Sequence, residues 1–295
     1  MIPVARPASP DGRTPRLRSI AADLPLCHAS VRAAFEASEF EIAYQPILRL
    51  PDLRPVACEA LLRWTHPRRG AQRPAQFVPI LERSQLSLDV GDWLLTEASR
   101  QLLQWERAGL AALRLSVNVA PLQIQSPDFV TRLQDTLDAC ALPGHRLSVE
   151  ITQDLLLDRP DVAAAAAAQL SKLGVSLELD DFGGGPSVIG HLKAAGLHGF
   201  KIDRRFLDGL DSARDQDPHS DLRILVELAR NLGLRCVAES VQTDDELRVL
   251  ESLGVGEAQG NLFCAAMPPD AFESYLRGRH GNDPQRPRAT SMRGD

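Results

Sequence analysis

The stretch VSLELDDFGGGPSV, residues 175–188, predicts a buried strand that ends in two adjacent carboxylates and runs into three glycines. Successive side chains of a regular strand point to opposite faces, so Asp180 and Asp181 would face apart. Both can reach one site only where the chain leaves strand geometry, and the glycines after Asp181 would permit that turn. The stretch therefore predicts a functional site at the end of a strand.

Strand patterns of this kind recur along the chain and alternate with helical ones. We expect strands at residues 41–50, 55–64, 113–119, 146–151, 175–180, 199–202, 235–240 and 257–263. Helical periodicity occupies residues 75–84, 90–108, 121–139, 160–173, 187–195, 220–232, 244–253 and 269–277. This alternation predicts a parallel sheet with helices outside it.

The connections and the number of strands narrow the fold. The first two strands are joined by only LPDLR, residues 50–54, so they form an antiparallel hairpin. Eight strands over this length predict an α/β fold of the TIM-like (β/α)8 barrel type. An open doubly wound sheet is the competing arrangement, but the first strand is not followed by a Gly-rich phosphate-binding fingerprint.

Composition excludes several classes of protein. The chain has 295 residues, 44% of them hydrophobic, and a formal net charge of −6, which does not suit a nucleic-acid binder. It has no apolar run long enough for a membrane span and no secretory signal, so we expect a cytoplasmic protein that binds neither nucleic acid nor membrane. The five cysteines lack CxxC spacing and the seven histidines lack HxH or HExxH spacing, which argues against disulfides and zinc.

The two ends differ from the middle of the chain. Residues 1–25 and 279–295 are polar or rich in Pro and Arg, without periodicity, and we expect disordered tails there. Residues 26–278 are expected to form one domain.

Polar side chains recur at the ends of successive predicted strands. They are Glu59, Asn118, Glu150, Asp180, Asp181, Lys201, Glu239 and Gln259. A single acid at such a point would be read as a solvated rim residue. In a barrel, however, the C-terminal strand ends form the mouth where active sites are built, and a recurrent set there predicts a site.

The residue types indicate metal-dependent chemistry. Clustered carboxylates raise one another's pKa and are unfavourable without cations between them. A set of oxygen ligands with one amide favours Mg²⁺ or Mn²⁺ over zinc. The adjacent aspartates, Asp180 and Asp181, suit a site with two ions for phosphodiester hydrolysis, and Lys201 adds a positive charge for a water or a phosphate.

The full set of motifs resembles the EAL domain family of bacterial cyclic di-GMP phosphodiesterases. The matching motifs are YQPI (44–47), EAL (59–61), HP (66–67), SVN (116–118), VEIT (149–152), DDFG (180–183), KID (201–203), AES (238–240, where the family usually has AEG) and QG (259–260). Together they run from about residue 40 to residue 275 in the family's order. Because many short motifs agree in order, the resemblance is specific.

The resemblance implies a barrel with one antiparallel strand and hydrolysis of cyclic di-GMP to linear pGpG with two Mg²⁺ or Mn²⁺ ions. It implies that the metal ligands are Glu59, Asn118, Glu150, Asp180, Asp181 and Glu239. It implies catalytic roles for Glu59, Glu239 and Lys201, the last orienting or deprotonating the attacking water. It implies substrate-binding roles for Gln45, Leu61 and Arg63. For Arg63, a salt bridge at the rim of the barrel is the alternative. Gln259 is implied as a ligand of the water shell.

The sequence departs from the family pattern around the metals. Gln153 and Gln242 stand where the family has glutamates, one holding the loop after the aspartates and one near the metal water. The loop itself reads DDFGGGPSV instead of DDFGTGYSS, and the pair 265–266 is Ala-Ala instead of Arg-Pro. Replacing residues that support metal ligands without binding the metal themselves typically lowers metal affinity or activity by about 10–100-fold. We therefore expect turnover to be reduced.

Two further readings of the function remain open. An impaired EAL domain could act as a cyclic di-GMP receptor that passes its signal to a protein partner, or as an interaction module that has lost the ligand. Retained Gln45, Arg63 and Lys201 argue against loss of the ligand. The family also implies a homodimer formed through helices beside the metal loop.

Overall fold

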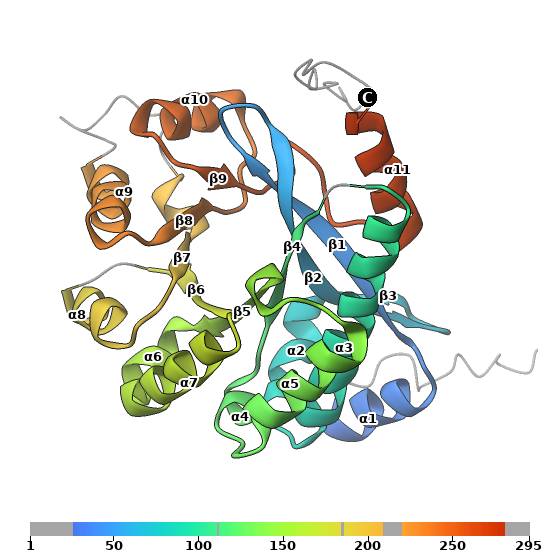
Figure 1. Ribbon diagram of the computed structural model, residues 1–295. Helices are drawn as coiled ribbons and strands as arrows, with labels where there is room; N and C mark the ends of the chain where they lie inside the picture. The colour runs from blue at the N-terminus through green and yellow to red at the C-terminus, as the bar shows by residue number, and fades with distance from the viewer. Residues whose placement is uncertain (1–25, 111, 184–185, 209–219, 281–295) are drawn as a thin grey trace, which may run out of the picture.

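The computed structural model describes residues 26–110, 112–183, 186–208 and 220–280, and within them eight strands close into a barrel (Figure 1). The hairpin of β1 (Phe40–Arg49) and β2 (Arg54–His66) is antiparallel, as predicted. The barrel continues through β4 (Arg114–Asn118), β5 (Leu147–Thr152), β6 (Ser176–Phe182), β7 (Gly199–Ile202), β8 (Arg235–Ala238) and β9 (Glu257–Ala258). β9 pairs with β1 and closes the ring.

The direction of the strands confirms the predicted barrel with one antiparallel strand. β1 is antiparallel to both β2 and β9, whereas the pairings from β2 through β4 to β9 are parallel. A ninth strand, β3 (Gly70–Gln72), was not predicted and extends β2 outside the ring. The C-terminal ends of β2 and β4–β9 therefore lie at one mouth.

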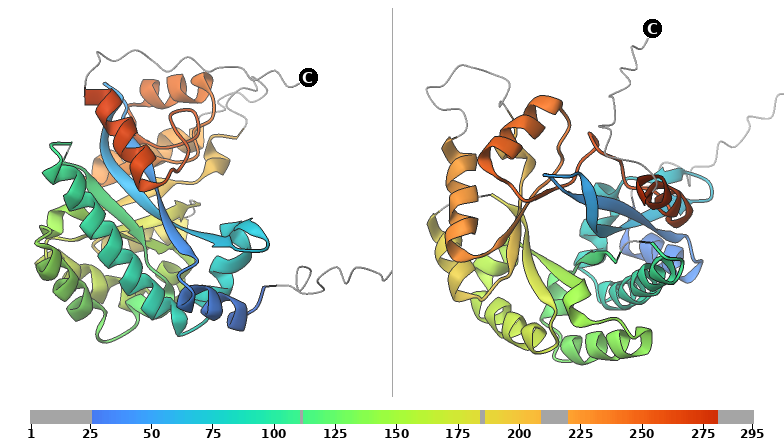
Figure 2. Two further views of the ribbon diagram at one scale, coloured as in Figure 1. Left: turned by 90° about the vertical axis from the view of Figure 1, so that its right-hand side faces the viewer. Right: turned by 45° about the horizontal axis from the view of Figure 1, so that its top comes forward.

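Helices cover the outside of the strands (Figure 2). Those at predicted positions are α2 (Pro74–Glu82), α3 (Leu86–Arg107), α5 (Phe129–Cys140), α7 (Pro160–Lys172), α8 (Pro186–Ala194), α9 (Ser220–Leu232), α10 (Asp244–Leu253) and α11 (Pro269–His280). Those without a predicted counterpart are α1 (His28–Glu36), α6 (Gln153–Asp158), η2 (Gly144–Arg146) and η3 (Arg204–Phe206).

Two predicted helices have different bounds. The helix expected at residues 121–139 is divided into α4 (Pro121–Ile124) and α5, because Pro127 between them has no backbone N–H to continue the first helix. α11 reaches His280, so residues 279 and 280, predicted as tail, are helical. The rest of both predicted tails lies outside the described residues.

The buried hydrophobic residues form three clusters, the smallest of which is Ile47, Ala57 and Val237. The main cluster packs the strands against the helices around them, and includes Tyr44, Trp105 and Phe272, whose rings pack with centroids 4.7 to 5.9 Å apart. The second cluster places α1 and α2 against the hairpin, through Phe40, Trp64 and Phe77 among others. Its aromatic rings explain why α1 docks beside the first strand.

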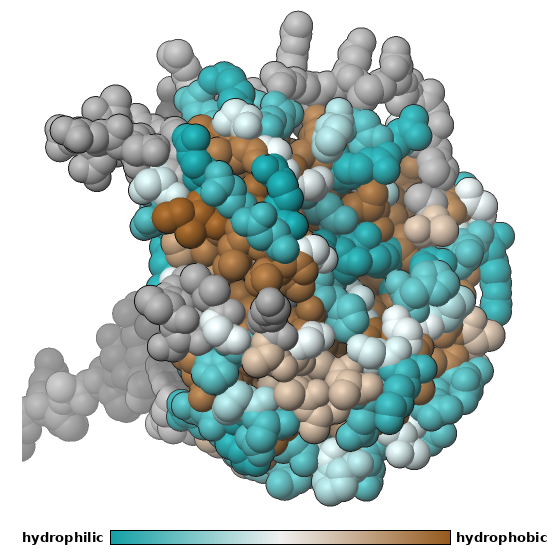
Figure 3. Space-filling view, turned by 60° about the vertical axis from the view of Figure 1, so that its left-hand side comes forward, coloured by the Kyte–Doolittle hydropathy of each residue, from teal (hydrophilic) through white to brown (hydrophobic). Residues whose placement is uncertain are grey.

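The surface shows a mixture of residue types. Figure 3 shows one face on which hydrophobic residues are bordered by hydrophilic ones. Among the large hydrophobic side chains of the described residues, Ile224 on α9 is exposed. None of the described helices combines the length and the hydropathy required to cross a membrane.

Two glycines that flank β9 allow a test of packing at the mouth. A Cβ on Gly260 would lie 2.2 Å from the backbone nitrogen of Val241, whereas a Cβ on Gly256 would meet nothing within 4 Å. Gly260→Ala should lower the free energy of unfolding by about 2–3 kcal/mol, because backbone must move apart. Gly256→Ala, the control, should change it by less than about 0.5 kcal/mol. Urea denaturation measures both, and equal effects would contradict the packing argument.

Candidate active site

A buried lysine lies at the centre of the mouth. Lys201 is on β7, its side chain is 1% exposed, and its Nζ faces the ends of the strands beside it. The Nζ atom lies 2.7 Å from Glu150 Oε2, 3.0 Å from Glu59 Oε2, 3.0 Å from Glu239 Oε1 and 3.4 Å from Asp180 Oδ1. One cation thus faces four carboxylates, so negative charge is in excess.

The excess charge is visible in the pKa values. Burial raises the pKa of Glu150 well above its usual range, with the charges of Glu59 and Asp180 adding to it. Burial, with Asp180, likewise raises the pKa of Glu239 to about 8 despite Lys201. Burial would lower the pKa of Lys201, but the surrounding carboxylates raise it well above the ordinary value.

Glu59 is the exception among the buried acids. Burial would raise its pKa, but Lys201 and hydrogen bonds from neighbouring amides lower it overall. Asn118 Nδ2 donates to Glu59 Oε1 at 2.7 Å, and Gln259 Nε2 donates to Glu59 Oε2 at 2.6 Å. Gln259 Nε2 also lies 3.2 Å from Glu239 Oε1. The two amides therefore hold acids from β2 and β8 toward the same point.

The two adjacent aspartates reach the same site through a local distortion of β6. Asp181 has a left-handed backbone, φ 49°, and the pairing register of β6 with β7 shifts between Leu179 and Phe182. The expected departure from strand geometry is present, and it occurs at Asp181 itself, before the glycines that were expected to permit it. Asp is among the few residues with a side chain that tolerate this conformation. Gly184 and Gly185 lie outside the described residues.

This arrangement fits divalent cations. One carboxylate oxygen each from Asp180, Asp181 and Glu239 lies within 4.8 Å of the others. Glu150 Oε2 and Asp180 Oδ1 are buried, and their contacts within the described residues are their ion pairs with Lys201. Oxygen donors with unmet charge suit a hard cation such as Mg²⁺ or Mn²⁺.

A cavity of about 440 Å³ opens beside the acids. The predicted residues on its wall are Gln45, Glu59, Leu61, Arg63, Asn118, Glu150, Asp180, Asp181, Glu239 and Gln259. Gln45 Nε2 donates to the carbonyl oxygen of Cys264 at 3.1 Å, and Arg63 Nη1 donates to that of Leu62 at 2.9 Å. Within the described residues, no salt bridge of Arg63 is found, so its substrate-binding role and the alternative of a rim salt bridge both stay predictions.

Gln153 and Gln242, the two glutamines that stand where the family has glutamates, lie in different environments. Gln153 Oε1 accepts the backbone N–H of Gly183 at 2.8 Å, so Gln153 touches the metal loop, as the resemblance implied. Gln242 is exposed and is not among the residues of the cavity wall, so its expected place near a metal-bound water stays a prediction. It lies between Ser240, whose backbone is left-handed, and the start of α10. Val188 is buried and belongs to the main core, which explains an apolar residue there.

Sequence reasoning missed two parts of the site. Ser116 Oγ donates to Glu150 Oε1, and its position two residues before Asn118 on the same strand face was the available signal. An apolar wall of the cavity comes from α2 and α3, through Val78, Leu81, Val90 and Leu94. These positions read as ordinary helix core, and no local signal marks them as cavity lining.

The fold and the site define a class: a closed (β/α)8 barrel with a candidate divalent-metal centre at its mouth, beside a cavity whose wall includes the side chain of Arg63. The family model described as "EAL domain" matches residues 28–266, and the chain belongs to the EAL domain family.

Named relatives agree with this family. The chain is 35% identical over 247 residues to the bifunctional diguanylate cyclase/cyclic di-GMP phosphodiesterase MucR of Pseudomonas aeruginosa, covering 84% of this chain and 36% of MucR. It is 34% identical over 241 residues to the cyclic di-GMP phosphodiesterase PA2567 of the same species, covering 81% of this chain and 40% of that protein. The chain thus spans little more than a third of the length of these relatives.

A solved structure also matches. The structure titled PaMucR phosphodiesterase, c-di-GMP complex, superimposes with a TM-score of 0.77 at 34% identity, covering 83% of this chain and 98% of that one.

Neutralising one acid of the cluster should separate stability from metal binding. Burial and the neighbouring Asp180 raise the pKa of Asp181, so Asp181→Asn removes repulsion and keeps a residue that tolerates the left-handed backbone. We expect the metal-free melting temperature to hold or rise, while the apparent Mn²⁺ affinity falls at least about tenfold. Melting curves across a Mn²⁺ titration measure both. Asp135→Asn, on the exposed face of α5, is the control and should change neither; unchanged Mn²⁺ affinity in Asp181→Asn would refute the metal site.

Proposed function

We propose that this chain hydrolyses one phosphodiester bond of cyclic di-GMP, giving linear pGpG, with two bound divalent cations. The observation that carries the proposal is the set of acids from β2, β5, β6 and β8 around Lys201, directly beside a cavity. The names of MucR and PA2567, and the cyclic di-GMP complex of the MucR phosphodiesterase, support the choice of substrate.

We assign the ligand role to Glu59, Asn118, Glu150, Asp180, Asp181 and Glu239. Bound Mg²⁺ or Mn²⁺ would supply Lewis-acid chemistry at the scissile phosphate. Lys201 Nζ is surrounded by these acids, so it orients the attacking water and stabilises negative charge that develops on the phosphate. Gln259 holds Glu59 and Glu239 in place through the hydrogen bonds of its amide.

Substrate binding falls to the β1–β2 hairpin. Arg63, on the cavity wall, presents a planar guanidinium that can bind phosphate oxygens in a bidentate manner. Gln45 and Leu61 line the same cavity. Because the proposed substrate is a bacterial second messenger, the proposed compartment is the cytoplasm. The homodimer and the protein partner stay predictions.

Single-turnover hydrolysis of labelled cyclic di-GMP, with Mg²⁺ and separately with Mn²⁺, tests the function. Product formation that is lost in Glu59→Gln is the expected result, because Glu59 is a proposed metal ligand whose pKa is lowered by Lys201 and by hydrogen bonds from two amides. Arg63→Ala should raise KM at least about tenfold with a smaller effect on kcat. Binding of cyclic di-GMP is titrated in parallel in the presence of Ca²⁺. Tight binding without product under Mg²⁺ or Mn²⁺ would favour a cyclic di-GMP receptor over an enzyme. No binding would exclude both the enzyme and the receptor.

The two glutamines should respond differently to restoration of the family's glutamate. Gln153→Glu would give the N–H of Gly183 a charged acceptor, which strengthens such a bond by about 1 kcal/mol, or roughly fivefold in loop ordering. We therefore expect a severalfold faster single turnover. Gln242→Glu is the matched control, because Gln242 is exposed and outside the cavity wall. Equal acceleration by both changes would contradict the placement of Gln242.

A further inference from the structure

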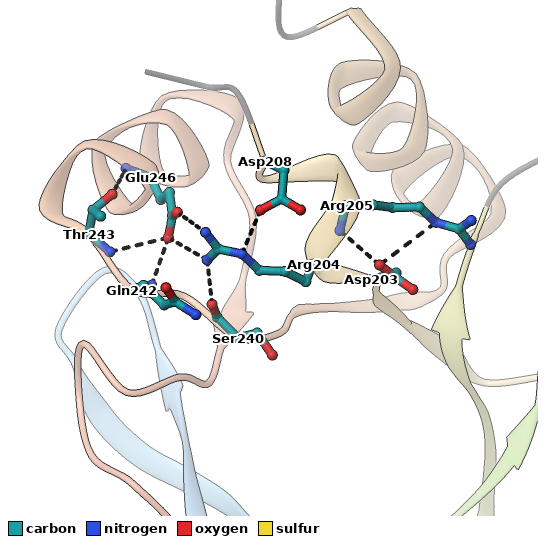
Figure 4. Close-up of polar contacts among 8 residues, drawn as sticks. All are labelled: Asp203, Arg204, Arg205, Asp208, Ser240, Gln242, Thr243 and Glu246. Carbon is teal, nitrogen blue, oxygen red and sulfur yellow. Dashed lines mark hydrogen bonds and ion pairs between the residues drawn. The ribbon is translucent and has the colours of Figure 1, made fainter. Parts of the chain in front are cut away.

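An arginine–glutamate pair lies behind the metal-ligand loops. Arg204 on η3 faces Glu246 on α10 with both guanidinium nitrogens: Nη2 lies 2.8 Å from Oε1, and Nη1 lies 3.1 Å from Oε2 (Figure 4). The side chain of Glu246 is 3% exposed and that of Arg204 is 29% exposed. This is a partly buried bidentate pair, a geometry that fixes both partners in orientation as well as in distance.

Glu246 also closes the segment that leads into its own helix. Its Oε2 accepts the backbone N–H of Gln242 at 2.6 Å and that of Thr243 at 3.2 Å, and Thr243 Oγ1 accepts the N–H of Glu246 in return (Figure 4). This reciprocal pattern is a capping box, which satisfies the free donors at the start of α10. The carboxylate thus joins η3 to the loop between β8 and α10.

That loop contains a strained residue directly after a proposed metal ligand. Ser240 follows Glu239 and has a left-handed backbone, φ 54°. The family pattern has glycine here, which adopts this conformation freely, whereas a residue with a Cβ pays of the order of 1 kcal/mol or more. Arg204 Nη1 donates to the carbonyl oxygen of Ser240 at 2.7 Å. The same guanidinium that pairs with Glu246 therefore holds the strained turn.

Both ends of this network connect to the site. Arg204 follows Lys201 by three residues, and the strands that carry Lys201 and Glu239 pair through Ile202 and Ala238. The N–H of Glu239 donates to the carbonyl oxygen of Ile202 at 3.2 Å. The network thus sets how the chain leaves β7 and β8 immediately beyond the two charged side chains.

We infer that Arg204 and Glu246 are positioning residues of the metal centre: they hold Ser240 in its left-handed turn and so keep Glu239 aligned with Lys201 and the aspartates of β6. The inference rests on the proposed metal-dependent function. It also accounts for the left-handed turn at Ser240, where the family pattern has glycine.

Arg204→Gln tests the inference without substrate. It removes the bidentate pair and the bond to Ser240, so the affinity for Mn²⁺, followed by the paramagnetic resonance signal of the free ion, should fall about 10–100-fold. With cyclic di-GMP, kcat should fall while KM changes by less than about threefold, because Gln45 and Arg63 are untouched. Arg248→Gln, at an exposed arginine of α10 paired with Asp245, is the matched control and should change neither.

A rescue experiment distinguishes positioning from general destabilisation. Ser240→Gly, added to Arg204→Gln, should recover at least about threefold of the lost Mn²⁺ affinity, because glycine adopts the turn without the guanidinium. If Arg204→Gln does not fold, Glu246→Gln serves instead, since its amide oxygen can still accept a backbone N–H while the ion pair is lost. Wild-type Mn²⁺ affinity in a folded Arg204 or Glu246 variant, or a loss that Ser240→Gly leaves unchanged, would overturn the inference.

Failure of the function and failure of the inference give different results. If the wild-type chain binds Mn²⁺ but forms no pGpG, the proposed hydrolysis fails, and the Mn²⁺ titrations still decide the role of Arg204. If the wild-type chain forms pGpG and the Arg204 variant matches it in Mn²⁺ affinity and kcat, the hydrolysis stands and the positioning role fails.

Discussion

The placement of a lysine ammonium among four carboxylates is the interaction on which the mouth of this barrel depends. Without Lys201, the acids of β2, β5, β6 and β8 would be like charges taken out of water with no compensating cation. With it, negative charge remains in excess, and the pKa values of Glu150 and Glu239 rise as burial and neighbouring acids disfavour ionisation. The remaining negative charge is what bound divalent cations would balance.

Closure of the barrel brings side chains that are far apart in the sequence close together at the strand ends. Neighbouring parallel strands place their ends at one level, so Asn118 is the direct partner of Glu150, and Gln45 is the partner of Glu59 across the hairpin. β9 brings Gln259 back to Glu59, 200 residues earlier in the chain. Each strand contributes one or two groups, and the register of the sheet determines which of them meet.

Backbone strain is found on both sides of the lysine. Asp181 and Ser240 both take left-handed conformations, one within β6 and one after β8, and each adjoins a proposed metal ligand. Such conformations persist only where surrounding contacts determine them. At Ser240 the contacts come from Arg204, which is itself fixed by Glu246. Arg204 and Glu246 are thus linked through Ser240 to the proposed metal ligand Glu239, and neither residue lines the cavity.

The sequence by itself determined the barrel class, the hairpin, most of the helices and the set of acids, because strand periodicity, short connections and ordered motifs are local properties. Tertiary structure decided that Asp181 takes a left-handed backbone, that Gln242 is exposed, and that α2 and α3 supply an apolar wall to the cavity. It also decided the pairing of Arg204 with Glu246. These features depend on backbone torsions and on contacts between distant segments, which no local pattern encodes.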